Sequence, residues 1–262
     1  MSIHPTAIID TEAELHESVE VGPFCVIEEN VRVDAGCTIM HGVFLTGWTH
    51  IGKDCTIHPG AIVGHSPQDV KYSGERAYCR IGAGTTIREH VTIHRGSDPE
   101  SETVVGDECF LLAGSHIAHN CRLGRNVTLI NKVLLAGHVS VEDFVTIGGG
   151  AGVHEFVRIG ERAMVRGGAR VPMDVPPFAL TDDAGRIAGV NRVGLRRAGI
   201  DGEALLDIRQ IYRTLYARAA RFSEAVATVA GESHTPAGRR PVAFLTAKSQ
   251  RGLAGRSRRP SN

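Results

Sequence analysis

The chain has 262 residues, of which 42% are hydrophobic, 22% charged and only 5% aromatic, with 31 glycines. This composition excludes an intrinsically disordered chain, and no apolar run approaches the roughly 18 residues that a membrane-spanning helix needs. The formal net charge of zero conceals two blocks, because residues 1–185 carry 14 Lys and Arg against 24 Asp and Glu, whereas residues 186–262 carry 15 against 5. The first residues show no basic and apolar leader, so we expect a cytoplasmic protein.

Aliphatic residues recur at every sixth position from Ile3 to Val171. Of the 29 positions in this register, 26 hold Ile, Leu or Val, and the exceptions are Asp69, Glu75 and Pro99. Four positions after each aliphatic stands a small or β-branched residue. A period of six fits neither an α-helix nor a simple alternating strand, but it fits a short strand followed by a turn. Three such units form one triangular coil with the aliphatic side chains inside, so equivalent positions recur at i+18.

Stacked coils pair their backbones about 4.8 Å apart, so nearly nine coils give a prism roughly 40 Å long. The stacked aliphatic side chains are then the core, which explains how so few aromatics suffice. The pattern resembles the hexapeptide-repeat proteins, and that resemblance implies an all-β fold, a left-handed parallel β-helix. The exceptions to the register predict loops near 66–80 and 97–104.

The register ends after residue 172, and helical periodicity follows it. We therefore expect two domains, a β-helix over 1–185 and a small α-helical C-terminal domain over 186–262. Asp201 and Ser223 are suitable N-caps for the first two helices. The expected helices cover residues 202–219, 224–230 and 241–249, and a disordered end is expected over 256–262.

Six cysteines all occupy the small-residue position of the register. A disulfide framework or a metal cluster would not be expected to obey a packing register, so we interpret these thiols as small hydrophobic core residues. They are Cys25, Cys37, Cys55, Cys79, Cys109 and Cys121.

Thirteen histidines are many for this length, and several of them are spaced by nearly whole coils. His138 follows His119 at i+19, close to one coil, and His154 follows it at i+35, close to two coils. Stacking therefore brings these imidazoles, with His116, to one side of the prism.

Two kinds of chemistry could use such a cluster. Hexapeptide-repeat carbonic anhydrases bind zinc through three histidines that include a pair five apart, and no such pair occurs here. We therefore expect no metal and no cofactor. Acyl transfer fits better, because a neutral imidazole can deprotonate a hydroxyl while a backbone N–H stabilises the oxyanion.

Around these histidines the chain resembles the UDP-N-acetylglucosamine O-acyltransferases of lipid A biosynthesis, over about residues 3–230. The loop that precedes the histidine-rich coils is the most specific part of the resemblance. The motifs are Gln68-Asp69-Val70-Lys71-Tyr72-Ser73-Gly74-Glu75, Thr92-Ile93-His94-Arg95-Gly96, His116-Ile117-Ala118-His119, Leu135-Ala136-Gly137-His138-Val139, Asp174-Val175-Pro176-Pro177 and Gly194-Leu195-Arg196-Arg197.

The resemblance implies that His119 is the general base on the glucosamine 3-hydroxyl and that the Gly137 N–H holds the thioester oxyanion. It implies that Gly167 lies in the coil that limits the length of the acyl chain, where a small residue would leave room for a longer chain. The sugar nucleotide would be surrounded by Asp69, Lys71, His94, His116, His138, His154, Glu155, Asn191 and Arg197. The implied donor is a 3-hydroxyacyl chain on acyl carrier protein, an acidic partner that suits the basic C-terminal block. The implied assembly is a homotrimer whose active sites lie between neighbouring prisms, with no nucleic acid bound.

Several positions depart from the family pattern. Asn120 follows His119 where some relatives have Asp, and Glu155 stands where Gln is common. Lys132, Val193 and Ala198 are further departures. They leave two alternatives open, an N-acyltransferase acting on an amino-sugar nucleotide and a non-catalytic paralogue that binds sugar nucleotide or carrier protein.

Overall fold

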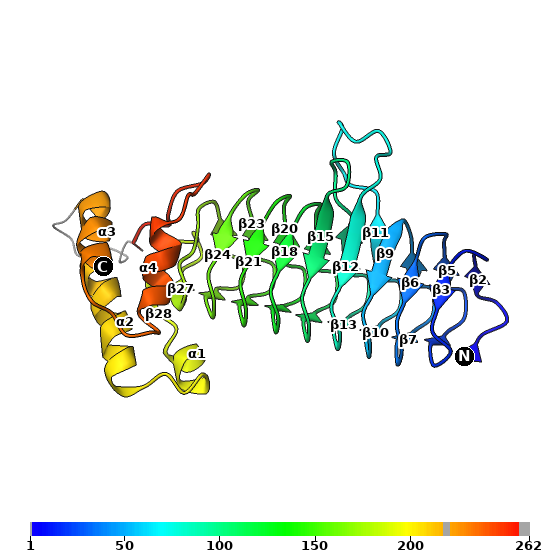
Figure 1. Ribbon diagram of the computed structural model, residues 1–262, viewed down its shortest axis with the longest axis horizontal. Coiled ribbons are helices and arrows are strands. Elements are labelled where there is room, and N and C mark those ends of the chain that lie inside the picture. The colour runs from blue at the N-terminus through cyan, green and yellow to red at the C-terminus, as the bar shows by residue number, and fades with distance from the viewer. Residues whose placement is uncertain (1, 217–220, 257–262) are drawn as a thin grey trace.

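The computed structural model describes residues 2–216 and 221–256. The N-terminal part is a long prism made of three parallel β-sheets, and four helices gather at the opposite end of the described chain from the N-terminus (Figure 1). The helices are α1 (Arg192–Arg197), α2 (Gly202–Leu215), α3 (Phe222–Gly231) and α4 (Arg239–Thr246). Within the described ranges, no helix is both long and apolar enough to cross a bilayer.

Each face of the prism is one sheet, and successive strands of the chain visit the three sheets in turn. Sheet A consists of β1 (Ser2–Ile3), β4 (Glu20–Val21), β7 (Thr38–Ile39), β10 (Thr56–Ile57), β13 (Thr86–Ile87), β16 (Phe110–Leu111), β19 (Thr128–Leu129), β22 (Thr146–Ile147), β25 (Met164–Val165), β27 (Ala179–Thr181) and β28 (Ile187–Val190). Sheet B consists of β2 (Ile8–Ile9), β5 (Val26–Ile27), β8 (Phe44–Leu45), β11 (Ile62–His65), β14 (Thr92–His94), β17 (His116–Ile117), β20 (Leu134–Leu135), β23 (Gly152–Val153) and β26 (Arg170–Val171). Sheet C consists of β3 (Glu14–Leu15), β6 (Arg32–Val33), β9 (Trp48–Ile51), β12 (Tyr78–Ile81), β15 (Glu102–Val105), β18 (Arg122–Leu123), β21 (Ser140–Val141) and β24 (Arg158–Ile159).

The repeat register sets the core. Ser2 pairs with Glu20 and Thr128 pairs with Thr146, so one coil comprises three units of the repeat. The second residue of each short strand points inward, and beyond the first coil the aliphatics at this position, such as Ile57 and Leu129, are buried. The expected fold class is confirmed: a left-handed parallel β-helix followed by a small helical region.

Two insertions leave the prism without disturbing its register. Trp48 pairs with Tyr78 and Tyr78 pairs with Glu102, so the first of these coils is longer than the regular coil by two repeat units and the second by one. The insertions form loops over 66–77 and 95–101, and the first stands out from the prism in cyan in Figure 1. Both loops end before the expected positions 80 and 104, because β12 and β15 begin before the aliphatic register resumes.

All six cysteines are buried and unpaired, as the packing interpretation predicts. Most of their thiols donate to a backbone carbonyl of the next coil; for example, Cys121 Sγ lies 3.1 Å from the Ala136 oxygen. The thiols therefore fill corners of the prism as small core residues.

The helical region departs from expectation mainly at helix ends. Helix α2 begins at the expected residue, but the Asp201 side chain makes no capping hydrogen bond. Helix α3 has Arg221 at the N-cap and begins at Phe222, before the start that a Ser223 cap would require. Helix α4 begins and ends a few residues before the expected 241–249. The expected helical residues 217–219 and most of the expected disordered end lie outside the described residues.

The sequence pattern did not predict α1, β27 or β28. Strand β28 runs antiparallel to β27 at the end of sheet A, so the division drawn at 185/186 falls in a turn within one sheet. The last described residues also return to this region, since Asp174 bridges to Leu253. The prism and the helical region therefore share backbone hydrogen bonds.

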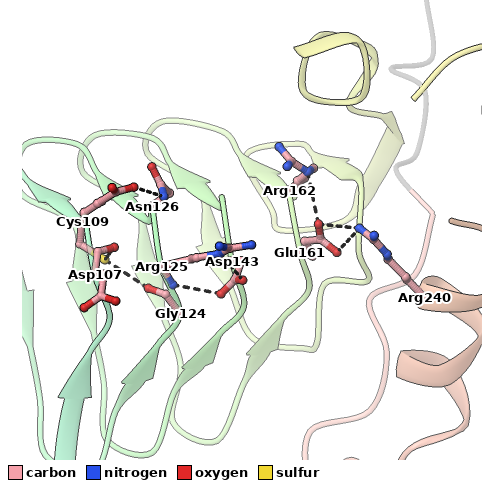
Figure 2. Close-up of polar contacts among 10 residues, drawn as sticks. Asp107, Cys109, Gly124, Arg125, Asn126, Asp143, Glu161, Arg162 and Arg240 are labelled. Carbon is pink, nitrogen blue, oxygen red and sulfur yellow. Dashed lines mark hydrogen bonds and ion pairs between the residues drawn. The ribbon is translucent and has the colours of Figure 1, made fainter. Parts of the chain in front are cut away.

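Charged side chains fasten α4 to the last coils. Figure 2 shows Glu161 between two arginines: Arg240 Nη1 lies 2.7 Å from each Glu161 oxygen, and Arg162 Nε lies 3.3 Å from Oε1. Nearby, Arg158 pairs at 2.8 Å with the buried Asp174, and its guanidinium lies 4.3 Å from the centre of the Phe244 ring. These contacts fix the helical region relative to the prism.

Candidate active site

A cavity of about 940 Å³ lies over the outer face of sheet B and the turns that follow its strands. Its lining is largely apolar with several imidazoles, the usual character of a small-molecule site. The lining residues are Gln68, His94, His116, Ala118, His119, Leu134, Leu135, Ala136, Gly137, Gly152, Val153, His154, Glu155, Arg170, Val171 and Pro172.

The regular length of the coil explains why these residues meet. Outward-facing residues of successive strands stack in a ladder, and the backbone pairs are His116 with Leu134, Leu134 with Gly152, and Gly152 with Arg170. Gly152 interrupts the ladder of side chains, and a Cβ there would meet no described atom within 4 Å. The ladder thus has a gap between Leu134 and Arg170 that widens the cavity.

His119 and Gly137 occupy the same turn position on consecutive coils, directly after β17 and β20. A Cβ built on Gly137 would lie 2.6 Å from His119 Cε1 and 2.8 Å from Nε2, so the imidazole rests against the glycine backbone. Within the described chain the Gly137 N–H donates to no acceptor. An imidazole and a free backbone N–H therefore lie side by side at the wall of the cavity.

Asn120 fixes the tautomer of the neutral His119 ring. Its side-chain oxygen lies 2.9 Å from His119 Nδ1, and the same oxygen accepts the Ser97 backbone N–H at 3.0 Å. Because a backbone N–H is always a donor, the atom facing it is the amide oxygen. That oxygen has no hydrogen to give, so neutral His119 carries its proton on Nδ1 and has a lone pair on Nε2. Asn120 therefore orients the imidazole of His119.

Three further histidines of the site are poised to remain neutral. Burial, reinforced by the charge of neighbouring histidines, lowers the pKa of His94 to about 4. Burial is also the main cause that lowers the pKa of His116 and of His138. The His94 and His116 ring centres are 4.7 Å apart, and His94 Nδ1 is buried with no hydrogen-bond partner among the described residues. These rings offer neutral donors and acceptors to a ligand.

The loop over 66–77 reaches the cavity through Gln68, while Asp69 and Lys71 belong to the same loop. Arg95 ties this loop to the prism, because its Nε donates to the Tyr72 hydroxyl at 3.0 Å and its Nη1 to the Gly64 carbonyl at 2.9 Å. The guanidinium also lies 5.5 Å from the centre of the Tyr72 ring.

The structure gathers some of the expected site residues and leaves others apart. His94, His116, His119, Gly137, His154 and Glu155 line one cavity, and the His138 ring lies 5.3 Å from that of His119. Asn191 and Arg197 belong to the start and end of α1, and the Asn191 amide is used there, accepting from the Gly194 N–H and donating to the Arg162 carbonyl. Gly167 follows a strand of sheet A and lies over Gly149, outside the cavity lining.

Sequence reasoning gave no role to Gln68, Arg170 or Ser97. The repeat register could have indicated Arg170, because this residue stands one coil after Gly152 at an outward position. Ser97 lies in an insertion, where no periodicity indicates its neighbours. Among the described residues, no three His, Cys, Asp or Glu side chains are arranged to hold a metal ion.

Comparison with known proteins shows the family of this chain. The chain is 44% identical over 256 residues to the acyl-[acyl-carrier-protein]–UDP-N-acetylglucosamine O-acyltransferase of Halorhodospira halophila, covering 96% of this chain and 98% of the relative. The enzyme of the same name from Thermodesulfovibrio yellowstonii is 44% identical over 232 residues, covering 88% and 90%. The chain belongs to the acyl-[acyl-carrier-protein]–UDP-N-acetylglucosamine O-acyltransferase family.

A solved structure of the same family matches most of the chain. The UDP-N-acetylglucosamine acyltransferase of Bacteroides fragilis superposes with a TM-score of 0.91 at 35% identity, over 96% of this chain and 99% of that one. The family model described as UDP N-acetylglucosamine O-acyltransferase, domain 2, matches residues 174–254, which include the four helices of the described chain. The O-acyltransferase likeness thus covers both the prism and the helical region.

Proposed function

We propose that this chain transfers a 3-hydroxyacyl group from acyl carrier protein to the 3-hydroxyl of UDP-N-acetylglucosamine, the first step of lipid A biosynthesis. The observation that carries the proposal is the His119–Gly137 pair, an imidazole with a free Nε2 beside a backbone N–H that has no acceptor in the described chain. The relatives named for this O-acyl transfer favour an ester product over the amide of the N-acyltransferase alternative.

In the proposed reaction, His119 Nε2 takes the proton of the sugar 3-hydroxyl as its oxygen attacks the thioester carbonyl. The Gly137 N–H donates to the carbonyl oxygen as it becomes negative. The C–S bond then breaks, the new ester is left on the sugar, and the proton on Nε2 passes to the departing thiolate of the carrier's prosthetic group. His119 regains its starting tautomer, and no cofactor is consumed.

The sugar nucleotide is proposed to lie against the histidines of the cavity, with His94, His116 and His138 neutral at physiological pH. His94 lines the cavity, and its imidazole is proposed to contact a sugar hydroxyl or amide. Asp69 and Lys71 on the loop and His154 and Glu155 at the cavity wall complete the proposed acceptor site.

Asn191 and Arg197 do not line the cavity of their own chain. We propose that they serve the cavity of a neighbouring chain in a homotrimer, where Arg197 suits a diphosphate. In such an assembly Gly167 would also face the acyl chain of an adjoining site, and its lack of a side chain would leave room for a long acyl group.

The positive charge of the helical region supports the proposal that the donor is acidic. A smaller cavity, of about 420 Å³, is lined by Arg192, Arg209, Arg213 and Arg256, and no acidic residue of the described chain lines it. This cationic surface suits acyl carrier protein. Because both proposed substrates are water-soluble molecules of the cell interior, we propose a cytoplasmic location.

The test is incubation of the purified protein with UDP-N-acetylglucosamine and a series of 3-hydroxyacyl carrier proteins, with the product followed by mass and by its lability to mild base. We expect a base-labile ester and a fall in kcat of about 10²–10⁴-fold for His119→Ala. The control is His16→Ala, which removes an exposed histidine of an early coil. Binding of nucleotide sugar with no turnover from any donor would instead support the non-catalytic alternative.

A further inference from the structure

The amide oxygen of Asn120 is held from two sides. Besides the imidazole of His119, it faces both the backbone N–H and the hydroxyl of Ser97, each at 3.0 Å. The Ser97 hydroxyl has one other acceptor in reach among the described residues, Asp98 Oδ2, at the longer distance of 3.5 Å. A flip of the Asn120 amide would place an NH₂ group opposite the Ser97 N–H, so this hydrogen bond would be lost, and the Ser97 hydroxyl could no longer donate to Asn120.

The short insertion over 95–101 fixes Ser97 in this position. Asp98 N–H donates to Ser101 Oγ at 3.0 Å, and the Ser101 hydroxyl donates back to the Asp98 carbonyl at 2.7 Å, which closes the turn next to Ser97. A Cβ on Gly96 would lie 2.3 Å from Ser101 Oγ, so the turn is closed tightly on its other side as well. Asn120 is equally constrained, because its N–H donates to the buried Thr103 hydroxyl and its φ is +59°.

We propose that Ser97 is a positioning residue for His119. By holding the Asn120 oxygen against Nδ1, Ser97 keeps the neutral imidazole in the tautomer whose Nε2 is unprotonated. This inference rests on the proposed function, in which Nε2 is the base. It also gives the second insertion a role, since the insertion brings Ser97 within hydrogen-bond distance of the residue that follows the base.

The decisive measurement is the tautomer itself, by NMR of protein labelled with ¹⁵N and ¹³C in histidine, with the His119 signals assigned from His119→Gln. In the wild type we expect the Nδ1–H tautomer alone at a pH where the ring is neutral. Ser97→Ala should show a measurable fraction of the Nε2–H form, whereas Ser97→Thr, which keeps the hydroxyl, should match the wild type. An unchanged tautomer in Ser97→Ala would overturn the proposal.

Kinetics provide the second readout. Loss of one neutral hydrogen bond predicts a fall in kcat of about 3- to 10-fold for Ser97→Ala, with the KM for UDP-N-acetylglucosamine unchanged. Ser140→Ala is the matched control, since this serine occupies the outward-facing position of β21 and its hydroxyl has no hydrogen-bond partner among the described residues. A rise in KM with kcat unchanged would contradict a role in positioning the base.

Asn120→Gly supplies a second route if Ser97→Ala does not fold, because glycine accepts the positive φ at this position. It removes the acceptor altogether and should mix the two tautomers more strongly than Ser97→Ala, while Asn120→Asp should preserve the wild-type tautomer. The tautomer can be measured without turnover. A failure of this proposal is therefore distinct from a failure of the proposed function, which would appear as full activity in His119→Ala.

Discussion

The imidazole of His119 lies directly against the backbone of Gly137, with only the space of a hydrogen atom between them. The two residues occupy equivalent positions on consecutive coils. The same stacking that builds the prism therefore brings a base and a backbone donor together. Any side chain at position 137 must displace the ring, because the neighbouring atoms of His119 are 2.6 to 2.8 Å from the Cβ it would add.

Gly137→Ala should therefore impair catalysis while leaving the fold intact. A ring moved by about 1 Å can lose roughly 10²-fold in rate, and we expect a fall in kcat of that order. The measurement is steady-state kinetics with thermal unfolding alongside. Gly231→Ala is the control, since a Cβ there meets no described atom within 4 Å. If Gly137→Ala kept wild-type kcat, the close contact between these residues would have no part in the reaction.

Tyr72→Phe tests whether the loop over 66–77 presents the acceptor site. The substitution removes the hydroxyl that accepts from Arg95 and donates to the Glu75 carbonyl at 2.9 Å. We expect the KM for UDP-N-acetylglucosamine to rise several-fold and kcat to change little, because the loop carries proposed binding groups and not the base. Tyr78→Phe is the control, as its hydroxyl bonds Glu100 at the exposed surface. A selective fall in kcat would show that the loop acts on the chemistry instead.

The buried histidines predict a loss of stability in acid. His94 has a folded-state pKa of about 4, below the roughly 6.5 of an unfolded histidine, so the unfolded chain binds the proton more readily. The contribution of neutral His94 to the free energy of unfolding is intact above about pH 6.5 and falls as the pH drops toward 4. The loss is at most about 3 kcal/mol, at roughly 1.36 kcal/mol for each pH unit. Urea unfolding at several pH values gives the free energy of unfolding. Plotted against pH over this window, it should have a shallower slope for His94→Gln than for the wild type. Equal slopes would mean that His94 is protonated in the folded protein as easily as in the unfolded one.

The sequence predicted what depends on the repeat and missed what does not. The position of Ile57 in the register predicts its burial, and the spacing of His119 and His138 by nearly one coil predicts that their rings meet. Contacts between non-repeating parts, such as Ser97 with Asn120, follow from loop closure, for which no periodicity exists.

Contacts at the end of the prism also could not be predicted from the repeat pattern. Helix α1 is short, and its Asn191 cap is held by the Arg162 carbonyl of the prism, a contact that no pattern within the helix indicates. The contact of Arg240 with Glu161 likewise depends on how α4 docks against the last coils. Tertiary contacts between the prism and the helical region therefore determine where these helices form and dock, and local sequence does not.

We expect electrostatic attraction to capture the donor. The proposed docking surface for acyl carrier protein includes Arg209 and Arg213, both exposed on α2 and both lining the cationic cavity. Arg196 and Arg197, which belong to the same basic C-terminal block, lie in the last turn of α1. Electrostatic capture acts mainly on association and is screened over a Debye length of about 8 Å in physiological salt. Added salt should therefore raise the KM for acyl carrier protein much more than the KM for a short acyl-pantetheine thioester.

Charge reversal separates docking from chemistry. The double variant Arg209→Glu with Arg213→Glu should raise the KM for acyl carrier protein by about tenfold or more, because two attractions become two repulsions, and should leave turnover of the pantetheine thioester unchanged. Arg32→Glu is the control, an exposed arginine on β6 in the half of the prism far from the helices (Figure 1). Steady-state kinetics with both donors at two salt concentrations measure these effects. Equal salt sensitivity for the two donors, or an equal loss for both in the double variant, would show that these arginines are a solvated helix face and that the carrier protein binds elsewhere.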